Sequence, residues 1–316
     1  MQAIQYERYG GPEVLRQVDL PDPEPGPGEV RVRLFAAGLA PVDAKLRAGM
    51  LQAFFKLALP KIPGRDGVGV VDRLGAGAAG FATGDAVCVV ADQLAQGTCA
   101  QFVVCDAQRL VARPPGLSTH QAAALMQPGI SAWIAVMETA QVRPGMRVLV
   151  HGGAGAVGSL MLQLCRHLGA EVSATCRAEN RDYLLGLGAA RAIAYDTEDF
   201  GRLLRDQDVV FDLIGGETHA RSYPVLRPGG HLVYLTAAPI VDRSADAGVR
   251  VTRAAIADRP AALAAVAELA AQGVLRPVVA RVYPLADAGL AHAELERGRI
   301  TRGRVVFDIA PETGSA

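Results

Sequence analysis

The residues best suited to chemistry lie in segment 148–158, which reads VLVHGGAGAVG. Its glycines fit the pattern Gly-x-Gly-x-x-Gly between an apolar strand and a helix, which is the context that a dinucleotide site requires. We expect Gly153 to permit a sharp turn, Gly155 to let the backbone approach a pyrophosphate, and Gly158 to bring the helix close to the sheet. The free N–H groups and positive dipole of the helix start would bind the phosphates. The expected backbone contacts come from Gly153, Ala154, Gly155, Ala156, Val157 and Gly158.

The next predicted strand, residues 171–176, indicates which dinucleotide would bind. NAD sites usually place Asp or Glu at the end of this strand, where it bonds the adenosine ribose hydroxyls. Here the strand runs into Cys176 and Arg177 without a carboxylate. The planar guanidinium of Arg177 can bind a 2′-phosphate, and Thr175 can donate a hydrogen bond to it. The sequence therefore predicts NADPH, and the alternative interpretation of Arg177 is an ordinary surface arginine.

Potential metal ligands are scattered along the sequence. A catalytic zinc needs about three properly spaced His, Cys or carboxylate ligands, and the six histidines do not supply them. We expect no metal, and structural or surface roles for the histidines. Five dispersed cysteines without a Cys-x-x-Cys pair are typical of a reduced cytosolic protein. They are Cys88, Cys99, Cys105, Cys165 and Cys176. We therefore expect a cytoplasmic location.

Composition limits the class of partner. The chain has 316 residues, half of them hydrophobic, which is enough for a large core and for two domains. It carries 32 basic and 32 acidic residues, so no net charge attracts nucleic acid or an anionic membrane. No apolar run approaches the roughly 20 residues of a membrane span, and the N-terminus lacks a signal-peptide pattern. We expect a small-molecule substrate, with neither nucleic acid nor membrane as a partner.

The predicted elements change in character along the chain. The first third is rich in strands, at 29–37, 67–74 and 100–105. After about residue 118, strands and helices alternate, which indicates parallel βαβ units. The helices are predicted at 118–126, 130–140, 154–168, 179–187, 217–224 and 258–272, and the strands at 147–151, 171–176, 191–195, 208–213 and 230–235. The tail, 277–309, returns to strand, helix and strand, and in the simplest assembly it rejoins the N-terminal domain.

Together these motifs resemble the medium-chain dehydrogenase/reductase superfamily, and most closely its zinc-free quinone oxidoreductase branch, the ζ-crystallin-like proteins. The similar segments are AAGLAPVDAKLRAG at 36–49, IPGRDGVGVVD at 62–72, TGDAVC at 83–88, AAALMQPGISAW at 122–133, the glycine motif, DVVFDLIGG at 208–216 and the closing segment 274–309. The resemblance implies an α/β protein with two domains and the nicotinamide in the cleft between them. One is a GroES-like β-rich catalytic domain, at 1–120 and 274–316. The other is a Rossmann doubly wound parallel sheet domain, at 121–273.

The resemblance also implies roles for further residues. Tyr195 would help to hold the 2′-phosphate, while Ser131 and Thr236 would approach the nicotinamide ring. Relatives of this kind are commonly homodimers or homotetramers that pair their cofactor domains edge to edge, and strand 230–235 is a candidate edge.

Four positions depart from patterns found in the superfamily. Zinc-dependent members place Cys near position 40 and Gly-His-Glu near 64–66, whereas this chain has Ala40 and Gly-Arg-Asp at 64–66. The zinc-free branch usually has Asn at the position of Ala40 and often has Tyr at the position of Met50. Those side chains contact the cofactor or the substrate, so we expect these changes to alter substrate preference.

The expected reaction is hydride transfer from NADPH to an acceptor. Without a metal the acceptor must already be electrophilic, as quinones and α,β-unsaturated carbonyls are. Water, Asp43 and Lys45 are the candidate proton donors, although Asp43 could instead begin a helix and Lys45 could simply be solvated. Three hypotheses follow: reduction of a quinone or other activated carbonyl, reduction of an enone or enoyl double bond, and an NADPH-binding sensor or structural protein with little turnover.

Overall fold

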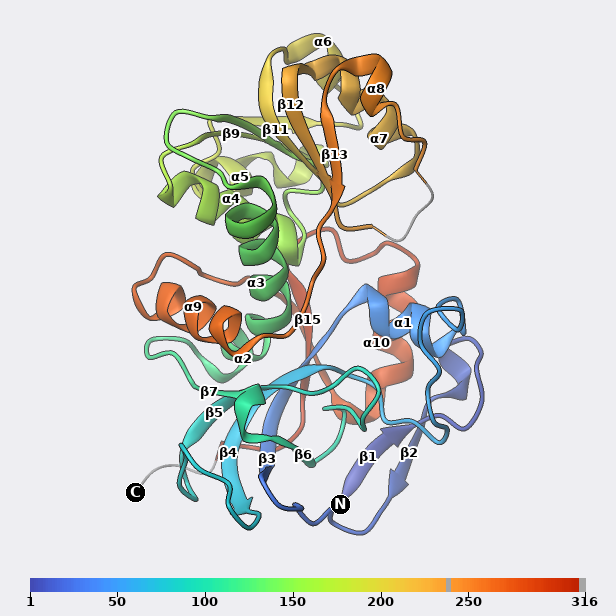
Figure 1. The fold of residues 1–316 in the computed structure, drawn as a ribbon. Helices are drawn as coiled ribbons and strands as arrows, with labels where there is room; N and C mark the ends of the chain where they lie inside the picture. The colour runs from blue at the N-terminus through green and yellow to red at the C-terminus, as the bar shows by residue number, and fades with distance from the viewer. Residues whose placement is uncertain (237–239, 313–316) are drawn as a thin grey trace. The chain divides into compact units, whose positions relative to one another are not determined.

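Figure 1 shows the computed structural model of the chain, which describes residues 1–236 and 240–312. The chain forms two compact units. Unit 1 consists of Met1–Gln127, Asp258–Ala271 and Pro277–Ala316, and unit 2 consists of Pro128–Ala257 and Gln272–Arg276. Relative to the predicted catalytic domain, unit 1 also includes residues 121–127 and 258–271. Within the described residues, every helix is too short or too polar to cross a bilayer.

Unit 1 is built on a seven-stranded sheet with the order β14-β15-β3-β4-β5-β7, in which β6 also pairs with β3. The strands are β3 (Glu29–Leu39), β4 (Asp66–Leu74), β5 (Ala86–Val90), β6 (Phe102–Asp106), β7 (Leu110–Ala112), β14 (Val279–Pro284) and β15 (Arg304–Asp308). Antiparallel pairing of β15 with β3 joins the C-terminal segment to the N-terminal sheet. Valines and leucines from β3, β4, β5 and β6 form a buried cluster against this sheet.

Shorter elements complete unit 1. Two strands, β1 (Gln2–Gln5) and β2 (Arg16–Asp19), form a separate antiparallel pair. The helices are α1 (Pro41–Arg47), α2 (Thr119–Ala123), α9 (Pro260–Ala271) and α10 (Ala288–Glu296), with 3-10 turns η1 (Pro12–Val14), η2 (Ala107–Arg109) and η6 (Leu285–Asp287). Helix α9 contacts β7 and η2 of this unit. Its apolar pattern indicated a helix, but not which sheet it would contact.

Unit 2 is a six-stranded, fully parallel sheet with the order β10-β9-β8-β11-β12-β13. The strands are β8 (Arg147–Val150), β9 (Glu171–Cys176), β10 (Arg191–Ala194), β11 (Gln207–Asp212), β12 (Leu226–Tyr234) and β13 (Arg250–Arg253). Counted from β8, this is the order 3-2-1-4-5-6 of a dinucleotide-binding Rossmann sheet. The predicted fold class is therefore confirmed.

One prediction about this sheet is wrong. Strand 230–235 was a candidate edge, but β12 lies between β11 and β13 and pairs with both. The edges are β10 and β13. Strand β13 lies at an edge, and its residues are partly or fully exposed. Its sequence, Arg-Val-Thr-Arg, therefore lacks the apolar run that identified the other parallel strands.

The helices of unit 2 are α3 (Met126–Trp133), which begins in unit 1, α4 (Ala156–His167), α5 (Arg181–Gly186), α6 (Phe200–Leu203), α7 (Gly216–Ser222) and α8 (Ser244–Ala247). Short turns η4 (Ala178–Asn180) and η5 (Tyr223–Val225) adjoin α5 and α7. The predicted helix 130–140 changes into a π-helix, η3 (Ile134–Ala140), and ends at Gln141, where φ is +53°. Thr139 Oγ1 donates to the Ile134 carbonyl across this wider turn, at 3.2 Å.

Candidate functional site

The glycine segment forms the turn between β8 and α4 at the carboxyl end of the parallel sheet. Gly152 has φ of +70°, so it is the residue that takes the left-handed conformation. The sharp turn expected at Gly153 therefore lies one position earlier. The N–H of Gly153 donates to the Thr175 carbonyl of β9 at 2.9 Å, which ties the turn to the neighbouring strand.

Each glycine of the motif meets a different steric limit. A Cβ on Gly153 would lie 2.7 Å from Ala174 Cβ, and one on Gly158 would lie 2.3 Å from the Gly152 carbonyl oxygen. Both positions are therefore filled by the protein itself. A Cβ on Gly155 would meet only the Gly152 oxygen, at 3.4 Å. Gly155 is also the N-cap of the twelve-residue helix α4, whose first N–H groups lack intrahelical acceptors. This open surface beside free donors can accept an anion.

A buried row of hydrogen bonds connects the glycine turn to the interior of unit 2. Ser222 donates its hydroxyl proton to the Thr218 carbonyl at 2.7 Å, so the Ser222 oxygen accepts from His151 Nε2 at 3.0 Å. His151 Nδ1 is then the acceptor for the Thr175 hydroxyl at 3.2 Å, and the Thr175 oxygen accepts the Gly152 N–H at 3.2 Å. Burial lowers the pKa of His151 to about 4, which keeps the ring neutral.

This row of hydrogen bonds bears on one predicted cofactor contact. Thr175 is 3% exposed, and its hydroxyl is engaged with His151 and Gly152. The geometry therefore favours a role in holding the glycine turn over the predicted hydrogen bond to a 2′-phosphate. A structural or surface role was expected for His151, as for every histidine, but its partner was not identified because Ser222 lies 71 residues away.

Arg177 and Tyr195 meet at the adjoining end of β9 and β10. Arg177 Nε donates to the Tyr195 hydroxyl at 3.3 Å, and Tyr195 is 54% exposed. The loop is held in place because Tyr195 N donates to the Cys176 carbonyl at 3.0 Å and Ala178 N donates to the Asp196 carboxylate at 3.0 Å. The Arg177 guanidinium and the Tyr195 hydroxyl, both expected to bind the 2′-phosphate, therefore lie together. Both side chains are at the surface.

The remaining predicted contacts of unit 2 are placed by different elements. Ser131 is buried in α3, and Thr236 is half-buried directly after β12. Because β12 lies two strands from β8 in a parallel sheet, Thr236 follows the same carboxyl edge that carries the glycine turn.

Asp43 and Lys45 lie on α1 in unit 1. Ala40 precedes this helix, Pro41 begins it, and the Asp43 carboxylate accepts the Ala40 N–H at 2.8 Å. Asp43 is 3% exposed, and burial raises its pKa to about 6 although the Ala40 N–H opposes the shift. Lys45 is half-buried on the same helix. Asp43 therefore takes the position of a helix-start anchor, which was the alternative weighed for it.

Arg65 and Asp66, at positions where zinc-dependent relatives have His and Glu, form ion pairs within the protein. Both Asp66 oxygens accept from Arg304, at 2.5 and 2.6 Å, and Asp66 also accepts the Gln127 N–H at 2.9 Å. Arg65 forms an ion pair with Asp258. Among residues 1–236 and 240–312, no three His, Cys, Asp or Glu side chains group as metal ligands.

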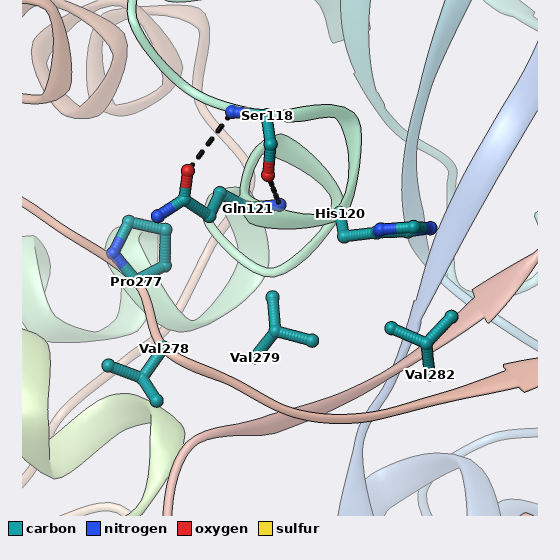
Figure 2. Close-up of a pocket in the computed structure, with 7 residues that line it drawn as sticks. All are labelled: Ser118, His120, Gln121, Pro277, Val278, Val279 and Val282. Carbon is teal, nitrogen blue, oxygen red and sulfur yellow. Dashed lines mark hydrogen bonds between the residues drawn. The ribbon is translucent and has the colours of Figure 1, made fainter.

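A groove of about 580 Å³ lies between α2 and β14 in unit 1, as Figure 2 shows. Its polar rim is used for capping α2, since Ser118 Oγ accepts from Gln121 N at 3.2 Å and Gln121 Oε1 accepts from Ser118 N at 3.0 Å. Val279 and Val282 supply its apolar side. None of the predicted site residues lines this groove.

Comparison with known proteins is consistent with this geometry. The alcohol dehydrogenase GroES-like domain family matches residues 26–144, and the zinc-binding dehydrogenase family matches residues 187–307. A quinone oxidoreductase of Pseudomonas aeruginosa is 32% identical over 96% of this chain and 98% of that protein. A 2-haloacrylate reductase of Burkholderia is 32% identical over 95% of this chain and 96% of that protein. The crystal structure of Escherichia coli quinone oxidoreductase complexed with NADPH has a TM-score of 0.89, with 27% identity, over 98% of this chain and all of that one.

The fold and the glycine turn define an oxidoreductase of the medium-chain dehydrogenase/reductase superfamily. Within that superfamily the chain belongs to the quinone oxidoreductase branch. One of the matching families is described as zinc-binding, but the residues here do not fit zinc. Ala40 and Arg65 have no zinc-binding atom, and both oxygens of the Asp66 carboxylate are engaged by Arg304, with the Gln127 N–H as a third donor.

Proposed function

We propose that the protein transfers hydride from NADPH to a quinone or another activated carbonyl acceptor. The observation that carries this proposal is the pair Arg177–Tyr195, joined at 3.3 Å at the end of β9, one strand from the glycine turn. The turn would bind the pyrophosphate, and the pair would bind the 2′-phosphate that distinguishes NADPH from NADH. Ser131 and Thr236 would contact the nicotinamide half, with Thr175 supporting the turn. NADPH supplies the hydride, and the protein supplies orientation and electrostatics.

The cofactor proposal has a direct kinetic test. The Escherichia coli relative crystallised with NADPH supports it. With one quinone as acceptor, kcat/KM for NADPH should exceed that for NADH by at least about tenfold, since a phosphate contact is expected to contribute about 1.4 kcal/mol or more. Equal efficiencies with the two nucleotides would contradict the assignment of the 2′-phosphate site.

We also propose that catalysis needs no metal, because the residues at the zinc positions offer no free ligand set. The acceptor must then be electrophilic before it binds. Turnover should be unchanged after treatment with a strong chelator. Loss of activity that zinc restores would overturn this part of the proposal.

The proton that follows the hydride has three candidate sources: water, Asp43 and Lys45. Asp43 holds the start of α1, so its substitution by Asn should change stability more than the pH profile. Lys45 is partly exposed on the same helix. If Lys45 donates the proton, Lys45→Met should lower kcat while leaving the Kd of NADPH unchanged. An unaltered kcat both in this variant and in Asp43→Asn would assign the role to water.

A second candidate function is reduction of an enone or enoyl double bond. It is favoured by the similarity, over nearly the whole chain, to a 2-haloacrylate reductase. Oxidation of NADPH should be followed with a quinone, a 2-alkenal and 2-chloroacrylate as acceptors. A higher kcat/KM with either unsaturated acceptor would favour the second function, and binding of NADPH without turnover on any acceptor would indicate a sensor.

We further propose a cytoplasmic homodimer or homotetramer. The exposed edge strand β13 is the surface by which the parallel sheets of two copies could pair. Light scattering of Val251→Pro, which places a ring in this edge strand, tests the proposal. The variant should dissociate to the next smaller species, and an unchanged mass would direct the interface elsewhere.

A further inference from the structure

Asp212, at the end of β11, organises the backbone at the carboxyl edge of the parallel sheet. Its Oδ1 accepts from the N–H groups of Ile214 and Gly215, at 2.9 and 2.8 Å. Its backbone carbonyl accepts from Leu235 N at 3.1 Å, directly before Thr236. Its Oδ2 lies 2.8 Å from His219 Nδ1 on α7. One buried residue therefore joins the loop after β11, the end of β12 and helix α7.

His219 extends this chain of contacts to a second segment. Its Nε2 lies 3.2 Å from the Tyr223 hydroxyl, and the two rings meet edge to face with centroids 5.5 Å apart. The Tyr223 hydroxyl lies 3.2 Å from the Val241 carbonyl and accepts the Arg243 N–H at 3.1 Å. Leu235 is thus tied to Asp212 directly, and residues 241–243 are tied to it through His219 and Tyr223.

Burial makes this arrangement more specific than apolar packing would be. Asp212, His219 and Tyr223 are 0%, 1% and 6% exposed. A buried carboxylate and imidazole are costly unless their hydrogen bonds are made, so such a network tolerates few alternative geometries. Apolar residues of similar volume would fill the same space but would leave the backbone of residues 241–243 without these contacts.

We propose that Asp212, His219 and Tyr223 are positioning residues for the nicotinamide half of NADPH. They act by fixing residues 235–236 and 240–243, which follow β12 and include Thr236. This inference rests on the proposed function, because only a bound nicotinamide gives these residues a reaction to position for. The adenosine end, at Arg177 and Tyr195, belongs to β9 and β10 and lies outside this chain of contacts.

Tyr223→Phe removes only the hydroxyl, which contacts His219, Val241 and Arg243. Tyr234→Phe is a matched control, because the Tyr234 ring also meets His219 edge to face, with centroids 5.6 Å apart, while its hydroxyl takes part in none of the hydrogen bonds described above. In Tyr223→Phe the Arg243 amide loses its acceptor, so its hydrogen exchange should become faster. The fluorescence of bound NADPH should change, and kcat should fall by about fivefold, while the Kd of NADPH stays within about twofold of its original value. Tyr234→Phe should show none of these changes.

Two results would overturn the inference. One is unchanged exchange at Arg243 in Tyr223→Phe. The other is faster exchange with neither the fluorescence of bound NADPH nor kcat altered, since the hydroxyl would then be purely structural. Failure of the unaltered protein to bind NADPH would instead refute the proposed function, and this inference with it. The partial rescue expected of His219→Gln over His219→Leu provides a second check, because Gln can still donate to Asp212.

Discussion

Arg304 Nη1 and Nη2 donate to the two carboxylate oxygens of Asp66, at 2.6 and 2.5 Å, where both side chains are almost fully buried. Arg304 Nε also donates to the Leu39 carbonyl at 3.3 Å, so the pair joins β15 to both β3 and β4. Where zinc-dependent relatives have an acidic residue near their metal, this chain has a structural ion pair.

Asp66→Asn should strongly destabilise the protein. The substitution leaves the buried Arg304 without a full counter-charge, and breaking such pairs typically costs about 3–5 kcal/mol. Urea unfolding measures the change. Arg73→Met is the control, because Arg73 pairs with Glu24 at an exposed site and should change the free energy of unfolding by at most about 1 kcal/mol. A small effect of Asp66→Asn, similar to that of the control, would contradict the assignment of a stabilising pair.

Two alanine substitutions in the glycine turn should separate folding from binding. Gly158→Ala brings a Cβ to 2.3 Å from the Gly152 carbonyl oxygen, so it should cost about 1–3 kcal/mol of stability and also weaken NADPH binding. Gly155→Ala meets no protein atom closer than 3.4 Å. It should unfold like the unaltered protein yet raise the Kd of NADPH by about tenfold or more, because its methyl group would occupy the surface proposed for a phosphate. Unweakened binding in Gly155→Ala would place the phosphates elsewhere.

Stability should fall as the pH drops below about 6.5, the ordinary pKa of histidine. Burial lowers the pKa of His151 and His231 to about 4 and that of His292 to about 3. The unfolded chain therefore binds three protons in this range that the folded chain binds only at lower pH, and this favours unfolding. Asp43 has the opposite sign, because its folded pKa of about 6 lies above its ordinary value and it takes up a proton in the folded state. Where all four groups titrate, the unfolded chain therefore binds about two more protons than the folded chain. The free energy of unfolding should then fall by about 1.4 kcal/mol per proton for each pH unit.

Urea titrations at a series of pH values between neutrality and about pH 4 measure this slope. His292→Leu provides the control, because both ring nitrogens of His292 lack a hydrogen-bond partner among the described residues. This variant should show a shallower dependence on pH. A stability that rises with acidity through this range would contradict the neutral state of these buried rings.

Local sequence signals predicted most of the fold. Each of these signals spans about ten residues or fewer, so it could be recognised without the structure. They are the alternation of apolar and polar side chains in β3, the apolar runs of strands β8 to β12 and the spacing of the motif glycines. Strand β13 was missed because an edge strand with two arginines has no apolar signature. The left-handed glycine was misplaced by one residue because the motif begins at Gly153, whereas the turn uses Gly152 directly before it.

The parts of the structure that were not predicted depend on contacts between residues far apart in the sequence. Gly38 shows this, because a Cβ there would lie 2.4 Å from the guanidinium carbon of Arg304, a residue from the other end of the chain. His219 and Tyr223 are spaced one helical turn apart, which could have been noted, but nothing local connects them to Asp212 or to residues 241–243. Such contacts are set by the strand order of the sheet.

Titration of NADPH and NADH into Arg177→Met tests the central claim most directly. Arg181→Met is the matched control, since Arg181 lies four residues away and pairs with Glu198. If Arg177 binds the 2′-phosphate, its substitution should raise the Kd of NADPH by about tenfold or more and leave that of NADH unchanged, while the control alters neither. An equal change for both nucleotides, or none for either, would contradict the account.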